Sequence, residues 1–152
     1  MKRFWGTIFA MLLLLLSTAT CFANIGNKQA AIGGVGPGCT LDYVRQVYGE
    51  PDSQQTKFED GMHMTKYYYG NSFVVCALRK KVINVKCTAN NLKTPDGIKV
   101  GMSSGMLPKT YGKESSTYQR KDLKYFVYSN GVKFLEFGVK NKKIVSIQCS
   151  VN

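Results

Sequence analysis

The stretch GPGCTLDYVRQVYGEP, residues 36–51, carries the signals of one short helix. Thr40 can accept a hydrogen bond from the unpaired N–H groups that open a helix. The apolar residues Leu41, Val44, Val47 and Tyr48 follow it at helical spacing. Gly49 and Pro51 are typical of a helix end. We therefore expect a helix that begins after Thr40, ends at Gly49 and buries one apolar stripe.

A second stretch, VGMSSGMLPKTYGKES at residues 100–115, repeats this pattern. Its Ser103 stands where the first stretch has Thr40, and a Tyr-Gly pair closes both stretches. Pro108 lies beyond the first turn of a helix capped by Ser103, where proline disturbs the backbone. The second helix is therefore expected to be short or kinked.

Segments rich in β-branched and aromatic residues follow each helix, which favours strands. KKVINVKC, ending at Cys87, recurs as KKIVSIQC, ending at Cys149, in the same order relative to the helices. Two matches in the same order indicate an internal duplication. The expected strands are 64–70, 71–78 and 81–87 in the first half, and 124–129, 132–139 and 143–149 in the second.

The last expected hairpin predicts the two faces of the sheet. With a tip at 141–143, Leu135, Phe137 and Val139 come opposite Cys149, Ile147 and Val145, and these residues share one apolar face. The residues expected on the other, polar face are Glu136, Lys140, Ser146 and Gln148. A sheet with one apolar face needs helices to cover that face.

The predicted fold class is α+β, a tandem duplication of a unit made of one helix and a three-stranded antiparallel sheet. A pseudo-twofold axis would relate the units, with the helices covering one face of one extended sheet or of two sheets side by side. Each unit alone would bury only about 60% of its unfolded surface. The expected divisions are a signal peptide at 1–23, a flexible lead-in at 24–34, repeat unit 1 at 35–88, a joint at 89–97 and repeat unit 2 at 98–152.

The helix-opening motif resembles that of the SmpA/OmlA family of small outer-membrane lipoproteins, which includes the E subunit of the β-barrel assembly machine. The tandem arrangement is similar to that of β-lactamase inhibitory protein, in which two helix-plus-sheet units form a concave sheet surface. Cys39 stands where the motif usually has Met. The resemblance implies a non-enzymatic module that binds proteins or envelope surfaces. It rests on Gly38-Cys39-Thr40, Val44 and Gly49-Pro51 in the first half, and on Gly101-Met102-Ser103, Leu107 and Gly112 in the second.

Residues 1–23 have a basic start, an apolar stretch and small residues before Ala23, which is the pattern of an export signal. Cleavage after Ala23 is expected, and lipidation at Cys21 is the alternative. After cleavage we expect no stable membrane span, since a spanning helix needs about 20 apolar residues. The protein is therefore expected in the periplasm or outside the cell.

The formal net charge is +12, from 21 Lys and Arg against 9 Asp and Glu. In an exported protein such a charge favours a protein partner or an anionic envelope component, and nucleic acid is not an expected partner. No cofactor is expected. No metal is expected either, because His63 is the single histidine and the cysteines lack metal-ligand spacing.

Four cysteines follow the expected signal peptide, and an even number in an oxidising compartment predicts two disulfides. Four cysteines allow three pairings, and the sequence does not choose among them. The pairing favoured here joins Cys39 with Cys76 and Cys87 with Cys149.

Tyrosines cluster in the expected strands of both halves. Consecutive strand residues point to opposite faces, so each cluster presents at least one ring away from the helices. Tyrosine is favoured at binding surfaces, and the alternative is ordinary packing within the sheet. The candidate binding residues are Tyr67, Tyr69, Tyr125 and Tyr128.

The predicted function is an exported, non-enzymatic binding module that presents its open sheet face to a protein or to the cell envelope. The alternative is a secreted enzyme inhibitor that uses the same face. A small hydrolase would need His63 as a base, oriented by Asp60, and a serine nucleophile. No nucleophile-elbow motif accompanies His63.

Overall fold

The computed structural model describes residues 25–59 and 61–152. The expected signal peptide, with Cys21 and Ala23, lies outside the described residues, and so does Asp60. The elements, in chain order, are α1 (Leu41–Tyr48), β1 (Ser53–Glu59), β2 (Met62–Tyr69), β3 (Phe73–Leu78), β4 (Lys81–Cys87), α2 (Met106–Tyr111), β5 (Ser116–Arg120), β6 (Leu123–Ser129), β7 (Lys133–Lys140) and β8 (Lys143–Val151).

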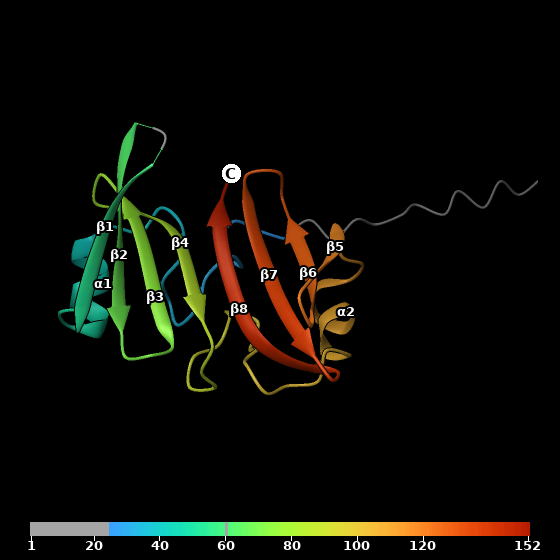
Figure 1. The fold of residues 1–152 in the computed structure, drawn as a ribbon. Coiled ribbons are helices and arrows are strands. Elements are labelled where there is room, and N and C mark those ends of the chain that lie inside the picture. The colour runs from blue at the N-terminus through green and yellow to red at the C-terminus, as the bar shows by residue number, and fades with distance from the viewer. Residues whose placement is uncertain (1–24, 60) are drawn as a thin grey trace, which may run out of the picture.

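The strands form one eight-stranded antiparallel sheet in the order β1-β2-β3-β4-β8-β7-β6-β5. The first four strands and the last four each form a meander, and the meanders join where β4 pairs with β8. Figure 1 shows both helices behind this sheet, α1 at the β1 end and α2 at the β5 end. The sheet therefore has one covered face and one open face.

The predicted fold class, a tandem of units with one helix and three strands each, is wrong. The chain folds as one continuous eight-stranded sheet, to which each half contributes four strands. The strands missed from the sequence are the edge strands β1 and β5. Their sequences, SQQTKFE and STYQR, are mostly polar, and the described side chains of both strands are exposed. A strand with no buried face has no apolar alternation to reveal it.

Helix α1 begins and ends where the sequence predicts. Thr40 is the N-cap, and its hydroxyl accepts a hydrogen bond of 3.2 Å from the backbone N–H of Tyr43. Gly49 ends the helix with a φ of 78°, a backbone conformation that glycine adopts without strain. Val44 is fully buried, whereas Val47, expected on the same stripe, is 46% exposed.

Helix α2 is short, as Pro108 predicts, but it begins later than expected. Ser103 is not its cap, because Ser103 pairs with Lys143 in an isolated β-bridge. The helix begins at Met106 after Gly105, which provides no side-chain cap. The later start places Pro108 in the first turn, where a missing N–H leaves no intrahelical bond unmade.

The pairing of β7 with β8 confirms the predicted faces. Leu135 pairs with Cys149, and Phe137 pairs with Ile147. All four side chains are fully buried. The predicted pairing of Val139 with Val145 is wrong, because the register shifts after Gly138 and Val139 pairs with Ile144.

The core lies between the sheet and the helices and includes the segment before α1. Ile32 and Val35 are fully buried, and the backbone N–H of each donates to the carbonyl of the other. The expected flexible lead-in at 24–34 thus packs against the core through Ile25, Ala30 and Ile32, whereas residues 26–28 are exposed. Glycines separate its apolar residues, so neither a helix nor a strand period shows in the sequence.

The two predicted disulfides find no support, since none of the cysteines in the described residues forms one. Cys76 lines the open face, whereas Cys39 packs against the core on the covered side, so the sheet separates that predicted pair. Cys87 pairs with Ile147, which makes Cys149 its diagonal neighbour. Diagonal neighbours lie about 7–8 Å apart, farther than a disulfide usually spans.

Candidate binding surface

A row of side chains crosses the open face through successive cross-strand pairs. Alternate residues of a strand point to opposite faces, so the sequence neighbours of these residues belong to the covered side. The row consists of Tyr68 on β2, Val74 on β3, Lys86 on β4, Gln148 on β8 and Glu136 on β7.

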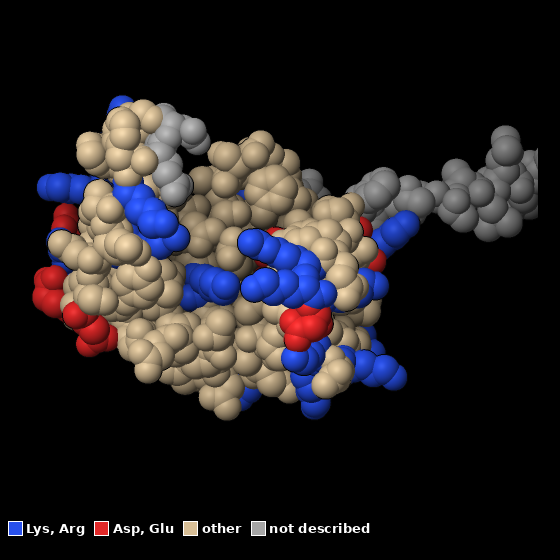
Figure 2. Space-filling view, in the orientation of Figure 1, with Lys and Arg blue, Asp and Glu red and all other residues tan. Residues whose placement is uncertain are grey.

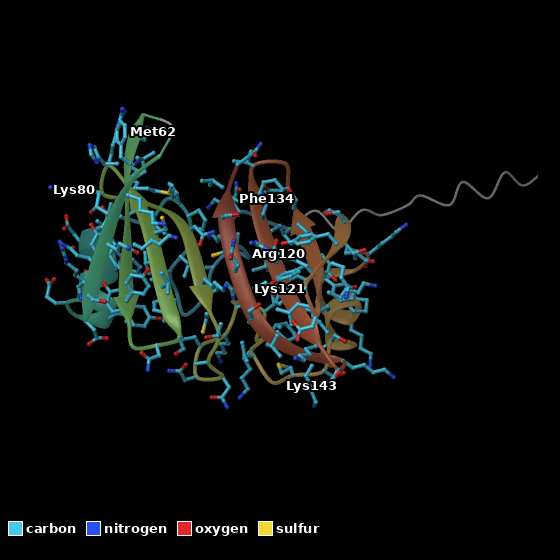
Figure 3. All side chains as sticks on the ribbon, in the orientation of Figure 1. Met62, Lys80, Arg120, Lys121, Phe134 and Lys143 are labelled. Carbon is cyan, nitrogen blue, oxygen red and sulfur yellow. The ribbon has the colours of Figure 1, made fainter. Side chains whose placement is uncertain are left out.

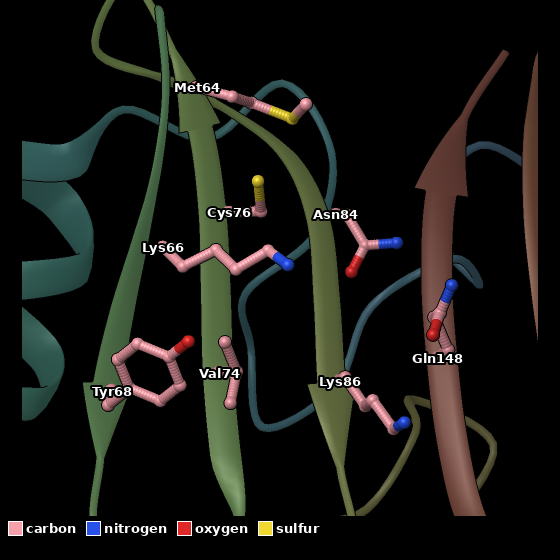
Figure 4. A pocket seen from close by; sticks show the side chains of 8 residues that line it. All are labelled: Met64, Lys66, Tyr68, Val74, Cys76, Asn84, Lys86 and Gln148. Carbon is pink, nitrogen blue, oxygen red and sulfur yellow. The ribbon is translucent and has the colours of Figure 1, made fainter. Parts of the chain in front are cut away.

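The first part of this row lies in a hollow of about 460 Å³, which we call the large hollow. Figure 4 shows its side chains next to one another on β2, β3, β4 and β8. Met64 and Val74 offer apolar surface, and Lys66 and Lys86 offer ammonium groups. The residues that line the hollow are Met64, Lys66, Tyr68, Val74, Cys76, Asn84, Lys86 and Gln148.

A second hollow, of about 130 Å³, adjoins the first and is called the small hollow. Lys86 and Gln148 line both hollows, so the two adjoin, and together we call them the depression. Arg120, at the end of edge strand β5, lines the small hollow together with Lys86 of β4. The sheet is therefore curved enough for these cations to approach the same depression. The lining residues are Lys86, Tyr118, Arg120, Tyr125, Glu136, Ser146 and Gln148.

Two stacked tyrosines form one wall of the small hollow. The rings of Tyr118 and Tyr125 are nearly parallel, at 9°, with centroids 4.7 Å apart. The Tyr118 hydroxyl donates a hydrogen bond of 2.7 Å to Glu136. Burial, and then this hydrogen bond, raise the pKa of Tyr118 to about 12. A side chain at Gly138 would place its Cβ 3.1 Å from the Tyr125 ring, so glycine provides the room that this ring occupies.

Positive charge dominates the depression. Figure 2 shows Lys and Arg side chains over the middle of this face, and Figure 3 labels Arg120 and Lys121 over its second half. The salt bridges within residues 25–59 and 61–152 do not include Lys66, Lys86 or Arg120. Asp122, beside Lys121, is paired with Lys140 instead, and the hydrogen bond from Lys140 holds the pKa of Asp122 below its usual value.

Only one of the four tyrosines singled out from the sequence lines the open face, namely Tyr125. Tyr128 is fully buried, so its selection as a surface binding residue is corrected. Tyr67 and Tyr69 are partly buried and pack against the core on the covered side. The tyrosines of each cluster thus divide between the two faces.

Sequence reasoning missed Tyr68, Tyr118, Lys86 and Arg120 as parts of the surface. Tyr68 is the middle residue of a Tyr-Tyr-Tyr run, and its direction depends on the register with β3. Tyr118 and Arg120 belong to an edge strand that the sequence pattern does not predict. For Lys86 the sequence did contain a signal. Its neighbours Val85 and Cys87 are apolar and buried, so alternation along β4 places Lys86 on the open face.

His63 is exposed near the β1–β2 turn, and its ring packs against Phe58 with centroids 4.8 Å apart. The hollow beside it is lined by Gly61, Met62, His63, Leu78 and Arg79. In the part of the chain that the structure describes, no three His, Cys, Asp or Glu side chains are grouped to hold a metal ion. Over the same residues, no helix has the length and apolar composition to cross a membrane.

Solved structures of low sequence identity share the fold. A cysteine-rich secretory protein from Staphylococcus aureus has a TM-score of 0.62 and 16% identity, over 82% of this chain and 48% of its own. An extracellular protein containing an SCP domain from Bacillus anthracis has a TM-score of 0.52 and 11% identity, over 76% of this chain and 44% of its own. The chain thus spans about half the length of these structures.

No protein-family model matches the sequence, and no curated protein matches it either. The SmpA/OmlA resemblance therefore has no support beyond its motif residues. A "putative beta-lactamase inhibitor protein" from Streptococcus mutans matches over 72% of this chain and 81% of its own, with 14% identity and a TM-score of 0.34. That similarity is too low to support an argument.

Proposed function

We propose that the protein is an exported, non-enzymatic binding module that holds a protein partner or an anionic envelope component on its open sheet face. The observation that carries the proposal is the depression on that face, two adjoining hollows lined by tyrosines, lysines, an arginine and side-chain amides. Tyrosine and arginine are enriched where proteins bind their partners. Tyrosine also offers a large contact area at a small entropic cost.

The chemistry of the depression fits binding better than catalysis. Glu136 is the single carboxylate that lines the two hollows, and it already accepts a hydrogen bond from Tyr118. His63 lines a separate hollow at the β1–β2 turn. The depression therefore supplies mainly contact area and positive charge.

A crosslinking experiment tests which face is used. A photo-crosslinking amino acid replaces Gln148 in the depression in one variant, and Lys109 on α2 in the matched control. Both variants are irradiated in cells and in envelope extracts. The proposal predicts a discrete crosslinked product from position 148 and none from position 109. Products from position 109 alone would contradict it.

A secreted enzyme as the partner would make the protein an inhibitor that acts through the same face. A panel of purified secreted hydrolases distinguishes this case, because inhibition at nanomolar concentration would identify the partner as an enzyme. Inhibition should weaken when Lys86 is changed to Glu. An intrinsic hydrolase activity lost on His63→Ala would contradict the non-enzymatic function.

A further inference from the structure

We propose that the partner enters the depression as an extended acidic segment of a polypeptide. One carboxylate of the segment lies between Lys86 and Arg120 in the small hollow, and an apolar side chain lies against Met64 and Val74 in the large hollow. This inference rests on the proposed function, because it specifies the chemistry of what the open face holds.

The charge of the depression selects an acidic ligand. Lys66, Lys86 and Arg120 line the two hollows against the single carboxylate of Glu136. A carboxylate suits the guanidinium of Arg120, which can donate two parallel hydrogen bonds. Cations with no salt-bridge partner on a concave surface attract an anion more strongly than isolated exposed charges do.

The apolar part of the large hollow favours a polypeptide over a polyanionic glycan. Met64 and Val74 lie beside the lysines of the same hollow. A polyanionic glycan has no apolar side chain to place there, whereas an acidic segment of protein can carry one near its carboxylates. The strands that line the large hollow, β2, β3, β4 and β8, each pair with neighbours on both sides, so their backbone is not available and recognition in that hollow comes from side chains.

The spacing of the two hollows fits an extended peptide. Val74 is on β3, and the small hollow lies over β8 and β7, two or three strands away. At about 4.8 Å per strand this separation is roughly 10–14 Å. An extended chain covers about 3.3–3.6 Å per residue. Because alternate residues of an extended chain point to opposite faces, the acidic and the apolar side chain are expected about four residues apart in the bound segment.

A titration followed by NMR tests the inference and detects weak binding. The nitrogen-15-labelled protein is titrated with a synthetic peptide that carries phenylalanine and aspartate about four residues apart, so that both side chains point to the same face of the extended chain. The control peptide has asparagine in place of the aspartate. We expect saturable shifts of the side-chain amide signals of Asn84 and Gln148 with the aspartate peptide, and at least about tenfold weaker binding of the asparagine peptide.

Two charge-reversal variants test whether the peptide binds at the proposed site. Lys86→Glu should raise the Kd of the aspartate peptide at least about tenfold. Lys109→Glu makes the same change in net charge on α2, and should alter the Kd less than about twofold, because solvent screens distant charges. Both lysines are exposed, so neither substitution disturbs the core.

Three results would overturn the inference. Equal Kd values for the two peptides would show that the carboxylate does not contribute to binding. No binding of either peptide, together with Lys86-dependent binding of a soluble polyanionic glycan, would make the ligand a glycan and leave the proposed function standing. Shifts confined to residues of α1 and α2 would contradict both the inference and the proposed function.

Discussion

Tyr128 and Tyr125 belong to the same strand, β6, and have opposite surroundings. Tyr128 is fully buried, and its ring centroid lies 5.1 Å from that of Tyr111 on α2. Tyr125 stacks on Tyr118 and lines the small hollow. The face to which each ring points, and not the residue type or the strand, determines whether it stabilises the fold or remains available for binding.

The same difference applies to the whole sheet. The covered face is filled by fully buried side chains such as Leu135, Phe137 and Ile147. The open face carries the polar side chains of Lys86, Gln148 and Glu136, which are cross-strand neighbours on β4, β8 and β7. Truncating a side chain on the covered face should therefore mainly change stability, and truncating one on the open face should mainly change binding. The predictions below test this division.

The largest effect is expected from Phe137→Ala. Removing a fully buried ring should lower the free energy of unfolding by about 3–5 kcal/mol. Tyr118→Ala removes a ring that is 43% exposed on the open side, and should cost clearly less. Urea denaturation measures both. Equal losses for the two variants would show that the two faces contribute alike to stability.

The second prediction concerns alkaline pH, which should lower the free energy of unfolding through two groups on the covered face. Burial raises the pKa of Cys149 and of Tyr128 to about 12, above ordinary values of about 8.5 and 10. Since the folded pKa is the higher one, folding favours the protonated form. This stability is fully present below the ordinary pKa and is lost as the pH rises toward 12, by about 1.4 kcal/mol per pH unit for each group.

Urea denaturation at a series of pH values measures this loss. Cys149→Ala should flatten the decline in the free energy of unfolding that begins near pH 9. An unchanged pH profile in this variant would mean that the thiol does not resist ionisation in the folded protein.

Gly138→Ala should cost about 1–3 kcal/mol of unfolding free energy, because the new Cβ would contact the Ser146 side chain and the Tyr125 ring. Ser146→Gly removes one of these neighbours, so the double variant should recover part of the loss. Urea denaturation of the two single variants and the double variant gives the coupling. If the double variant recovered no stability, the contact with Ser146 would not be the source of the strain.

The smallest stability effect is expected from Tyr128→Phe. The Tyr128 hydroxyl is buried without a hydrogen-bond partner among the described residues, so its removal should stabilise the fold by up to about 1 kcal/mol. Tyr111→Phe is the matched control, since the Tyr111 hydroxyl shares a buried hydrogen bond of 2.8 Å with Thr94. That variant should lose about 1 kcal/mol. A loss of stability in Tyr128→Phe would show that its hydroxyl is satisfied.

The sequence predicted the parts of the fold whose residues have a buried side. Thr40 and Gly49 marked α1 because capping depends on local contacts, and the alternation around Phe137 marked the faces of β7 and β8. The polar edge strands β1 and β5 could not be recognised in this way. Without them the strand number was too low, and Tyr118 and Arg120 were missing from the candidate surface.

The tyrosine cluster shows a second limit of sequence reasoning. Tyr67, Tyr68 and Tyr69 are consecutive, and the sequence states that they alternate without stating which one points outward. That choice depends on the pairing of Tyr68 with Val74, a contact between strands. Cysteine pairing was not predictable for the same reason, because Cys39 and Cys76 lie on different sides of the sheet.

Lysine footprinting of the free and the partner-bound protein tests most directly that the open face is the binding face. An amine-reactive reagent labels Lys66 and Lys86 in the depression and Lys109 on α2, and mass spectrometry measures each site. The account predicts that the partner protects Lys66 and Lys86 and leaves the labelling of Lys109 unchanged. Protection of Lys109 with continued labelling of Lys66 and Lys86 would contradict it.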